Sequence, residues 1–141
     1  MIKKYFKIFD RIISENSPTL IIAEIGINHL GSEDLCAEMI ISALNAGADC
    51  VKLQTINEEE SYLSNTESYK VFKGTQLSLS SIKRLKTIAE SNNGFLFSTP
   101  GDISSLRLLE MADMNAFKVS SGLFTNVPLI EEIIKCKQPI I

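Results

Sequence analysis

The stretch that decides the fold is IIAEIGIN at residues 21–28, an apolar run that ends in a polar residue. Three later stretches share this design: VKLQT at 51–55, FLFSTP at 95–100 and FKVSSG at 117–122. Apolar runs of this length between helical patterns are typical of parallel strands covered on both faces. Each run carries polar or charged residues near its carboxyl end. Because Lys and Glu are rarely buried unless paired, the strands are predicted to direct these side chains at one polar site.

Helical patterns lie between the predicted strands. The first helix is predicted to begin at an N-cap on Ser32 and to stop at Gly47. Three more are predicted over 80–91, over 104–111, and from Asn126 and Pro128 onward.

A long polar connection is predicted over residues 57–77. A loop of this length in a compact domain is more often functional or mobile than idle. Its three consecutive glutamates, Glu58, Glu59 and Glu60, are interpreted as a solvated face.

This alternation of strands and helices predicts the α/β class, either as an open doubly wound sheet or as part of a (β/α)8 TIM barrel. We expect the partial barrel, with about four βα units and the start of a fifth strand. A complete barrel typically takes about 250 residues, so 141 residues could supply about half of one. Residues 1–18 are expected to be a lead-in and 19–141 the half barrel. The apolar ending QPII at 138–141 predicts that a longer protein continues from it.

Composition narrows the function classes. The chain is 45% hydrophobic with a formal net charge of -3 and no Trp, so the basic footprint of a nucleic-acid-binding protein is missing. Three cysteines far apart in sequence fit reduced thiols of a cytoplasmic protein better than a zinc site or a disulfide framework. No apolar run approaches the roughly 20 residues of a membrane span, and the charged start fits neither a signal peptide nor an anchor.

The polar residues on the strands predict an anion site. Strand alternation places Glu24 on one face with Gly26 and Asn28, and it places Lys52 beside Gln54. Further polar residues of the predicted site are Lys118, Thr99 and Ser121. Two ammonium groups with hydroxyl donors suit a small, multiply charged anion such as a phosphorylated carboxylic acid. The alternative is a buried Glu24–Lys52 pair that only neutralises itself.

The single histidine, His29, is interpreted as a loop residue that hydrogen-bonds the backbone, rather than as a catalytic base. With one histidine in the chain, a two-histidine metal site is excluded.

Four ordered motifs resemble the sialic acid synthase (N-acetylneuraminate synthase) family. They are AEIGINHLGS at 23–32, AGADCVKLQT at 46–55, FSTPGD at 97–102 and FKVSSG at 117–122. The resemblance implies a TIM barrel followed by a small antifreeze-like domain. It also implies an enzyme that condenses phosphoenolpyruvate with an N-acetylated amino sugar such as N-acetylmannosamine, with a divalent metal, Mn or Mg.

Carried across by motif, the resemblance gives roles to the candidate residues. It implies phosphoenolpyruvate contacts for Lys52, Thr99, Lys118 and Ser121, a place in the same pocket for Gln54, and an active-site carboxylate for Glu24. The lysines would hold the anion, and Glu24 would orient or deprotonate water.

The chain departs from the family pattern at several positions. Leu123 stands where the family usually has a sugar-binding glutamate, and Leu30 and Gly101 replace a usual Asn and a usual Phe. The metal-binding histidines, the later strands and the antifreeze-like domain would lie beyond Ile141. We therefore expect the chain to be inactive alone, to have a possible complementary C-terminal half, and to form a homo-oligomer.

Two alternatives stay open. One is a truncated, catalytically silent domain that binds an anion or a partner chain through the edge of its half barrel. The other is an unrelated flavodoxin-like binding domain.

Overall fold

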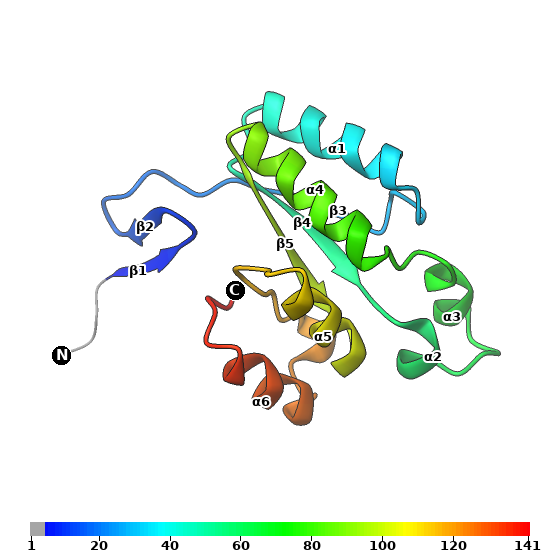
Figure 1. Cartoon of the computed structure of the whole chain (residues 1–141). Helices are drawn as coiled ribbons and strands as arrows, with labels where there is room; N and C mark the ends of the chain where they lie inside the picture. The colour runs from blue at the N-terminus through cyan, green and yellow to red at the C-terminus, as the bar shows by residue number, and fades with distance from the viewer. Residues whose placement is uncertain (1–4) are drawn as a thin grey trace.

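The computed structural model describes residues 5–141 (Figure 1). These residues form five strands: β1 (Tyr5–Ile8), β2 (Arg11–Ser14), β3 (Ile22–Gly26), β4 (Cys50–Thr55) and β5 (Phe95–Pro100). The helices are α1 (Glu33–Asn45), α2 (Glu58–Ser61), α3 (Glu67–Phe72), α4 (Leu79–Ser91), α5 (Ile103–Met111) and α6 (Val127–Lys135), with a 3-10 turn, η1, at Ser121–Leu123. No helix of this described part is long and apolar enough to cross a membrane.

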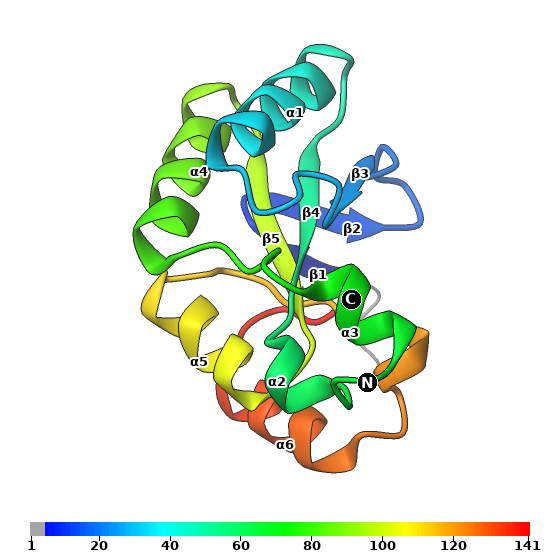
Figure 2. The ribbon, with the colours of Figure 1, turned by 90° about the vertical axis from the view of Figure 1, so that its right-hand side faces the viewer.

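Strands β3, β4 and β5 form a parallel sheet in the order in which they occur along the chain. Helices α1, α4, α5 and α6 follow one another around the outside of these strands (Figure 2). A sequential strand order with helices on the outer side is the arrangement of a (β/α)8 barrel, whereas a doubly wound sheet reverses its strand order. The α/β class and the partial barrel predicted from the sequence are confirmed.

The core lies between the sheet and its outer helices. Val51, Leu53 and Leu96 point to this side of the sheet and are at most 3% exposed. Helix α1 begins where the sequence predicts, since the Ser32 hydroxyl accepts a hydrogen bond from the backbone N–H of Leu35. Its buried residues Cys36, Ala37, Ile40 and Leu44 recur every three or four positions, which is the spacing of one helix face.

All three cysteines are free thiols, as the sequence predicts. Burial raises the pKa of the Cys36 and Cys50 thiols to about 12, so both stay protonated at neutral pH.

The strand predicted from the stretch 117–122 is wrong in extent. Only Phe117 makes parallel bridges there, to Ser98 on one side and to Ile140 on the other. The backbone N–H of Lys118 still donates to the carbonyl of Ser98 at 3.1 Å. From Ser121 the chain turns into η1, because Ser-Ser-Gly offers no apolar side chains to a sheet face and favours turns. The predicted fifth strand is likewise only the bridge at Ile140.

The alternation predicted for 21–28 fails after Glu24. The pairing of β3 with β4 shifts between Glu24 and Gly26, and Gly26 has φ of +62°, a left-handed conformation that glycine adopts without steric cost. Asn28 therefore lies in a turn, where its side-chain NH2 group donates a hydrogen bond to the carbonyl of Ile25 at 2.8 Å. The bulge ends the strand earlier than the apolar run suggested.

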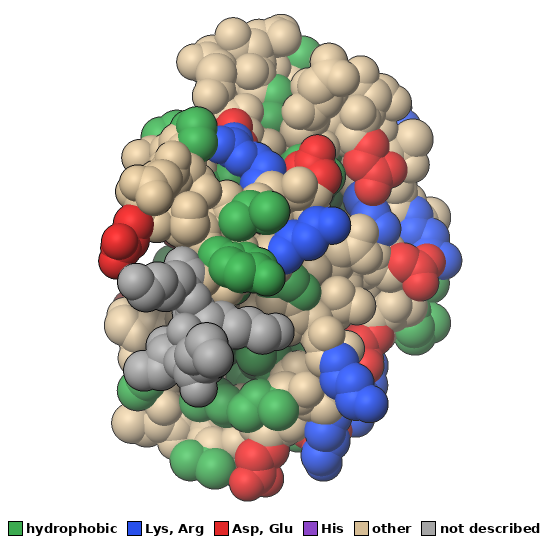
Figure 3. All heavy atoms as spheres, turned by 90° about the vertical axis from the view of Figure 1, so that its left-hand side faces the viewer, with side chains coloured by type: hydrophobic (Ala, Val, Ile, Leu, Met, Phe, Trp, Pro, Cys, Tyr) green, Lys and Arg blue, Asp and Glu red, His purple; other side chains and the backbone are tan. Residues whose placement is uncertain are grey.

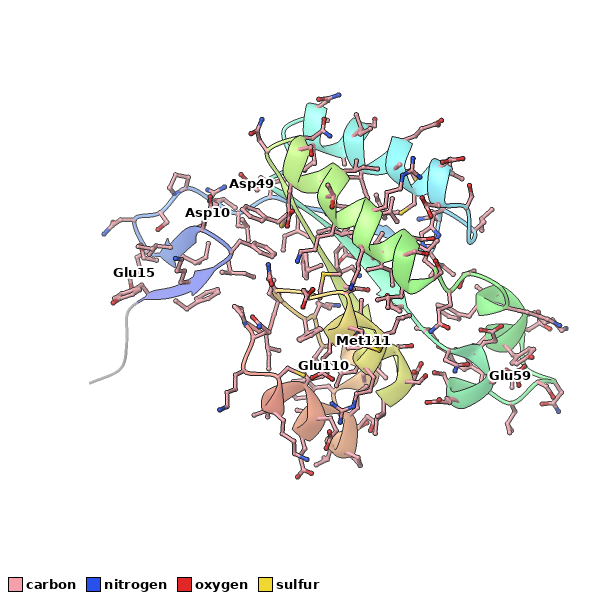
Figure 4. The ribbon with its side chains drawn as sticks, viewed as in Figure 1. Asp10, Glu15, Asp49, Glu59, Glu110 and Met111 are labelled. Carbon is pink, nitrogen blue, oxygen red and sulfur yellow. The ribbon has the colours of Figure 1, made fainter. Side chains whose placement is uncertain are left out.

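Residues 5–14, expected only to lead into the barrel, form a hairpin that packs on the sheet. Phe9, at its turn, stacks on Phe95 with ring centroids 4.5 Å apart and meets Phe97 edge-on at 5.8 Å. Arg11 forms an ion pair with Asp49, which precedes β4 (Figure 4). The hairpin therefore covers the amino end of the inner sheet face.

The predicted connection over 57–77 contains two short helices, α2 and α3. Its glutamates are not simply a solvated face. Glu59, a residue of α2 that is labelled in Figure 4, accepts a hydrogen bond from the hydroxyl of Tyr69 on α3. Glu58 accepts one from the backbone N–H of Gly74 at 3.1 Å. The segment is therefore ordered by its own acidic side chains.

Candidate active site

The inner face of the sheet carries a lysine–glutamate pair. Glu24 and Lys52 are register partners on β3 and β4, and the Lys52 ammonium lies 3.4 Å from a Glu24 carboxylate oxygen. The Lys52 side chain is 5% exposed and that of Glu24 is 63% exposed. A buried ammonium needs a partner, whereas an exposed carboxylate at this distance can also hydrogen-bond water or a ligand. The pair of the alternative interpretation exists, but only its cation is buried.

Gln54 and Thr99 lie one step further along the same face. They are register partners on β4 and β5, and both line a cavity of about 550 Å³. Thr99 is 1% exposed, and its hydroxyl has no hydrogen-bond partner within residues 5–141. Leaving a buried hydroxyl unpaired costs about 1–3 kcal/mol. This hydroxyl is the clearest sign that a ligand group is expected in the cavity.

The cavity is closed by segments that follow the strands. The segment after β4 supplies four wall residues: Ile56, Glu60, Ser61 and Tyr62. The segment after β5 supplies Gly101, Asp102 and Ile103. The η1 region and the start of α6 supply Ser120, Gly122, Leu123, Asn126 and Leu129. The site thus lies at the carboxyl ends of the strands, where α/β proteins bind their ligands.

Asp102 joins two of these walls. One carboxylate oxygen accepts hydrogen bonds from the backbone N–H of Ser105 at 2.7 Å and from the Ser104 hydroxyl at 2.9 Å, which caps α5. The other accepts from the backbone N–H of Asn57 at 2.7 Å and from the Ser61 hydroxyl at 3.0 Å. Four donors therefore occupy this carboxylate, and it acts as a tether rather than as a free base.

Tyr62 packs between this tether and α3. Its ring stacks on Phe72 with centroids 5.3 Å apart. Burial, together with the negative charge of Asp102, raises the pKa of its hydroxyl, so the phenol remains neutral. Neither Asp102 nor Tyr62 was among the predicted site residues. An Asp three positions before Ser105, directly after a strand, is an N-cap signal that could have located Asp102. Tyr62 has no comparable signal.

Gly101 is required by the packing of the cavity wall. A Cβ atom at this position would lie 2.4 Å from a side-chain carbon of Ile56. The glycine that departs from the family pattern therefore makes room for Ile56.

Lys118 and Ser121 are not brought into the cavity wall. Lys118 is half-buried and forms no ion pair among residues 5–141, and Ser121 is exposed at the start of η1. Of the six predicted site residues, the structure joins Glu24 with Lys52 and Gln54 with Thr99. Ser120 and Gly122, the two chain neighbours of Ser121, do line the cavity, so Ser121 lies at its rim.

His29 is a loop residue, as the sequence predicts. It is 1% exposed, and its Nδ1 accepts a hydrogen bond from the backbone N–H of Gly31 at 3.1 Å. Burial lowers its pKa, which favours the neutral ring.

Residues 5–141 contain no group of three or more His, Cys, Asp or Glu side chains that could hold a metal ion. The donor set for the divalent metal implied by the resemblance is thus not met by these residues.

Comparison with known proteins settles the family. The model of the NeuB family matches residues 39–141. The chain belongs to the NeuB family. Its resemblance to sialic acid synthases, predicted from four motifs, is thereby confirmed.

Three proteins are similar to this NeuB-family chain over most of its length. An uncharacterised protein of Methanocaldococcus jannaschii is 37% identical over 135 residues, covering 96% of the chain and 40% of the relative. The N,N'-diacetyllegionaminic acid synthase of Campylobacter jejuni is 34% identical over 137 residues, covering 87% and 41%. The crystal structure of N-acetylneuraminic acid synthetase from Leptospira borgpetersenii, in complex with citrate, matches with a TM-score of 0.90 at 29% identity, covering 96% and 48%. The chain therefore spans less than half the length of these relatives.

Proposed function

We propose that this chain carries the phosphoenolpyruvate-binding part of a cytoplasmic nonulosonic acid synthase. The observation that carries the proposal is the arrangement at the strand ends, where a buried Lys52 lies one step from a cavity containing an unpartnered Thr99 hydroxyl. An anion bound there would have its charge offset by the Lys52 ammonium and would accept a hydrogen bond from the Thr99 hydroxyl. The buried ammonium and the buried hydroxyl would then both have a partner.

The proposed reaction joins phosphoenolpyruvate to an N-acetylated amino sugar of the N-acetylmannosamine type. Carbon 3 of phosphoenolpyruvate forms a bond to the aldehyde carbon of the open-chain sugar, whose oxygen takes up a proton. Water adds at carbon 2, and phosphate leaves, giving the 2-keto acid. The carbon–carbon bond forms as the enol phosphate is converted to a keto group and free phosphate, so the reaction needs no oxidant or reductant.

This chain's residues would perform the anion-binding steps. Lys52 and Lys118 would hold the carboxylate and phosphate and offset the developing charge. Thr99, Gln54 and Ser121 would donate hydrogen bonds, and Glu24, held loosely by Lys52, would orient or deprotonate the attacking water. The large exposed fraction of Glu24 supports this role, because water can reach it.

Titration of the chain with phosphoenolpyruvate tests the proposal. We expect calorimetry to show binding that the Lys52→Ala, Lys118→Ala double variant loses by at least about tenfold, since two cationic contacts are removed. The matched control removes two exposed lysines, Lys70 and Lys83, and should bind like the unaltered chain. Binding that survives in the Lys52, Lys118 variant would overturn the proposed site.

A second candidate function is a catalytically silent domain that binds an anion or a partner chain. The Glu24–Lys52 pair favours it, because the pair can neutralise itself without a ligand. Phosphate release from phosphoenolpyruvate decides between the two when the chain is combined with a complementary C-terminal half and an amino sugar. Release that depends on the sugar supports the synthase, and no release with any amino sugar supports the silent domain.

A further inference from the structure

The loop between β3 and α1 is held together by its histidine. His29 is 1% exposed, and its Nδ1 accepts a hydrogen bond from the backbone N–H of Gly31 at 3.1 Å. Because Nδ1 is the acceptor, the neutral ring carries its proton on Nε2. The backbone carbonyl of His29 also accepts from the N–H of Ser32 at 2.8 Å. His29 therefore binds the last two residues before α1 begins.

The same loop contains an unfavourable backbone conformation. Leu30 has φ of +51°, in the left-handed region that is costly for a residue with a Cβ atom. Its side chain is 72% exposed, so little burial offsets this cost. Gly31 follows with φ of +80°. Two consecutive left-handed residues need a local contact that holds them, and the ring of His29 supplies one.

This turn meets the segment before α4, backbone against backbone. A Cβ atom at Gly31 would lie 2.3 Å from the carbonyl oxygen of Gly74 and 3.7 Å from the Cα atom of Thr75. A residue with a side chain could not approach so closely. The position of Gly31 therefore limits where Gly74 can lie.

Gly74 is in turn connected to the wall of the cavity. Its backbone N–H donates to the carboxylate of Glu58, the first residue of α2, at 3.1 Å. This short helix ends at Ser61, and Glu60, Ser61 and Tyr62 line the cavity. A displacement of Gly74 would therefore reach this part of the wall through one hydrogen bond and one turn of helix.

We propose that His29 is a positioning residue, whose neutral ring holds Gly31 against Gly74 and thereby keeps residues 58–62 in place as the cavity wall. The inference rests on the proposed function, because it makes this wall part of the phosphoenolpyruvate site. In this role His29 touches no ligand and transfers no proton. It acts on the site through the contact between two loops, one after β3 and one before α4.

Two substitutions of His29 test the hydrogen bond. In His29→Asn the side-chain oxygen can accept from the backbone N–H two residues further on, as in an Asx turn, whereas His29→Leu removes the acceptor. In His29→Leu we expect the amides of 57–62 to exchange about tenfold faster relative to those of α4. Phosphoenolpyruvate should bind to it about threefold more weakly, because binding must order the wall again. His29→Asn should restore both values, and equal values in the two variants would overturn the role of the ring.

Two glycines beside α1 test the contact between the loops. Gly31→Ala places a methyl group against the Gly74 carbonyl and should speed the exchange of 57–62 while His29 is intact. Gly47→Ala is the matched control, because Gly47 also has a positive φ, +99°, but its added Cβ would meet no other part of residues 5–141 within 4 Å. Equal effects of the two alanines on 57–62 would show that Gly31 does not position this segment. The glycine pair decides the question if His29→Leu fails to fold.

Exchange and calorimetry together separate this inference from the proposed function. Failure of the unaltered chain to bind phosphoenolpyruvate counts against the proposed function, while the exchange of 57–62 still decides whether His29 positions the wall. Unchanged exchange in His29→Leu, in a chain that binds phosphoenolpyruvate, counts only against the positioning role.

Discussion

At the scale of single residues, Thr99 is the position where stability and binding are in conflict. Its hydroxyl is buried without a partner, so Thr99→Val, which keeps the shape of the side chain, should raise the free energy of unfolding by about 1 kcal/mol. The same change should weaken phosphoenolpyruvate binding about tenfold, because the ligand loses a hydrogen bond. Urea unfolding and calorimetry measure the two effects.

Thr55→Val is the matched control for this prediction. The Thr55 hydroxyl is also buried, but it shares a 2.8 Å hydrogen bond with the Ser98 hydroxyl. Its removal leaves Ser98 unpaired and should lower the free energy of unfolding by about 1–2 kcal/mol. If both variants are destabilised equally, the Thr99 hydroxyl is not the unsatisfied group that the geometry indicates.

At the scale of helices and loops, Asp102 connects α5 to the segment after β4 through different oxygens of one carboxylate. Asp102→Ala removes the cap and the tether together, and should lower the free energy of unfolding by about 2–4 kcal/mol. In Asp102→Asn the amide oxygen can still cap α5, while the NH2 group faces the backbone N–H of Asn57. This variant should therefore break only the tether, and it should lower the free energy of unfolding by about half as much as Asp102→Ala. Urea unfolding ranks the two.

Hydrogen exchange separates the two parts of this prediction. In Asp102→Asn the amides of 57–62 should exchange faster while those of α5 remain protected. Asn126→Ala, which removes the cap of α6 alone, should leave 57–62 unchanged. Faster exchange in α5 with the asparagine variant would contradict a separate tether.

The elements also show where the sequence sufficed and where it did not. The strands carrying Lys52 and Thr99 were predictable, because buried parallel strands have a strong apolar pattern. The hairpin at 5–14 was missed, since its Phe9 contacts residues far away in sequence. The strand predicted around Lys118 is nearly absent, because its apolar run is too short to hold a ladder beyond Phe117. The positions of the candidate residues on strands β4 and β5 were therefore predictable, whereas cavity-lining residues placed by loops, such as Tyr62, were not.

At the scale of the whole molecule, the half barrel leaves apolar surface and backbone exposed on the hairpin side. Figure 3 shows hydrophobic side chains gathered on this face. Exposed apolar residues of the hairpin and of both sheet edges include Phe6, Ile12, Ile21 and Ile141, each at least 40% exposed. Within residues 5–141, β3 pairs only with β4, so its other edge has free hydrogen-bonding groups. Apolar patches beside an unpaired strand edge favour association between chains.

We therefore expect two copies of this chain to associate through the hairpin side, and light scattering after size exclusion should give a mass that rises with protein concentration. Ile12→Lys places a charge on this face and should shift the chain toward the monomer. Val71→Lys is the matched control, because Val71 on α3 has the same 56% exposure as Ile12. A monomeric mass at every concentration, or equal effects of the two substitutions, would show that the exposed face does not drive association. A selective effect of Ile12→Lys would instead identify this side of the half barrel as the surface through which the chain meets another.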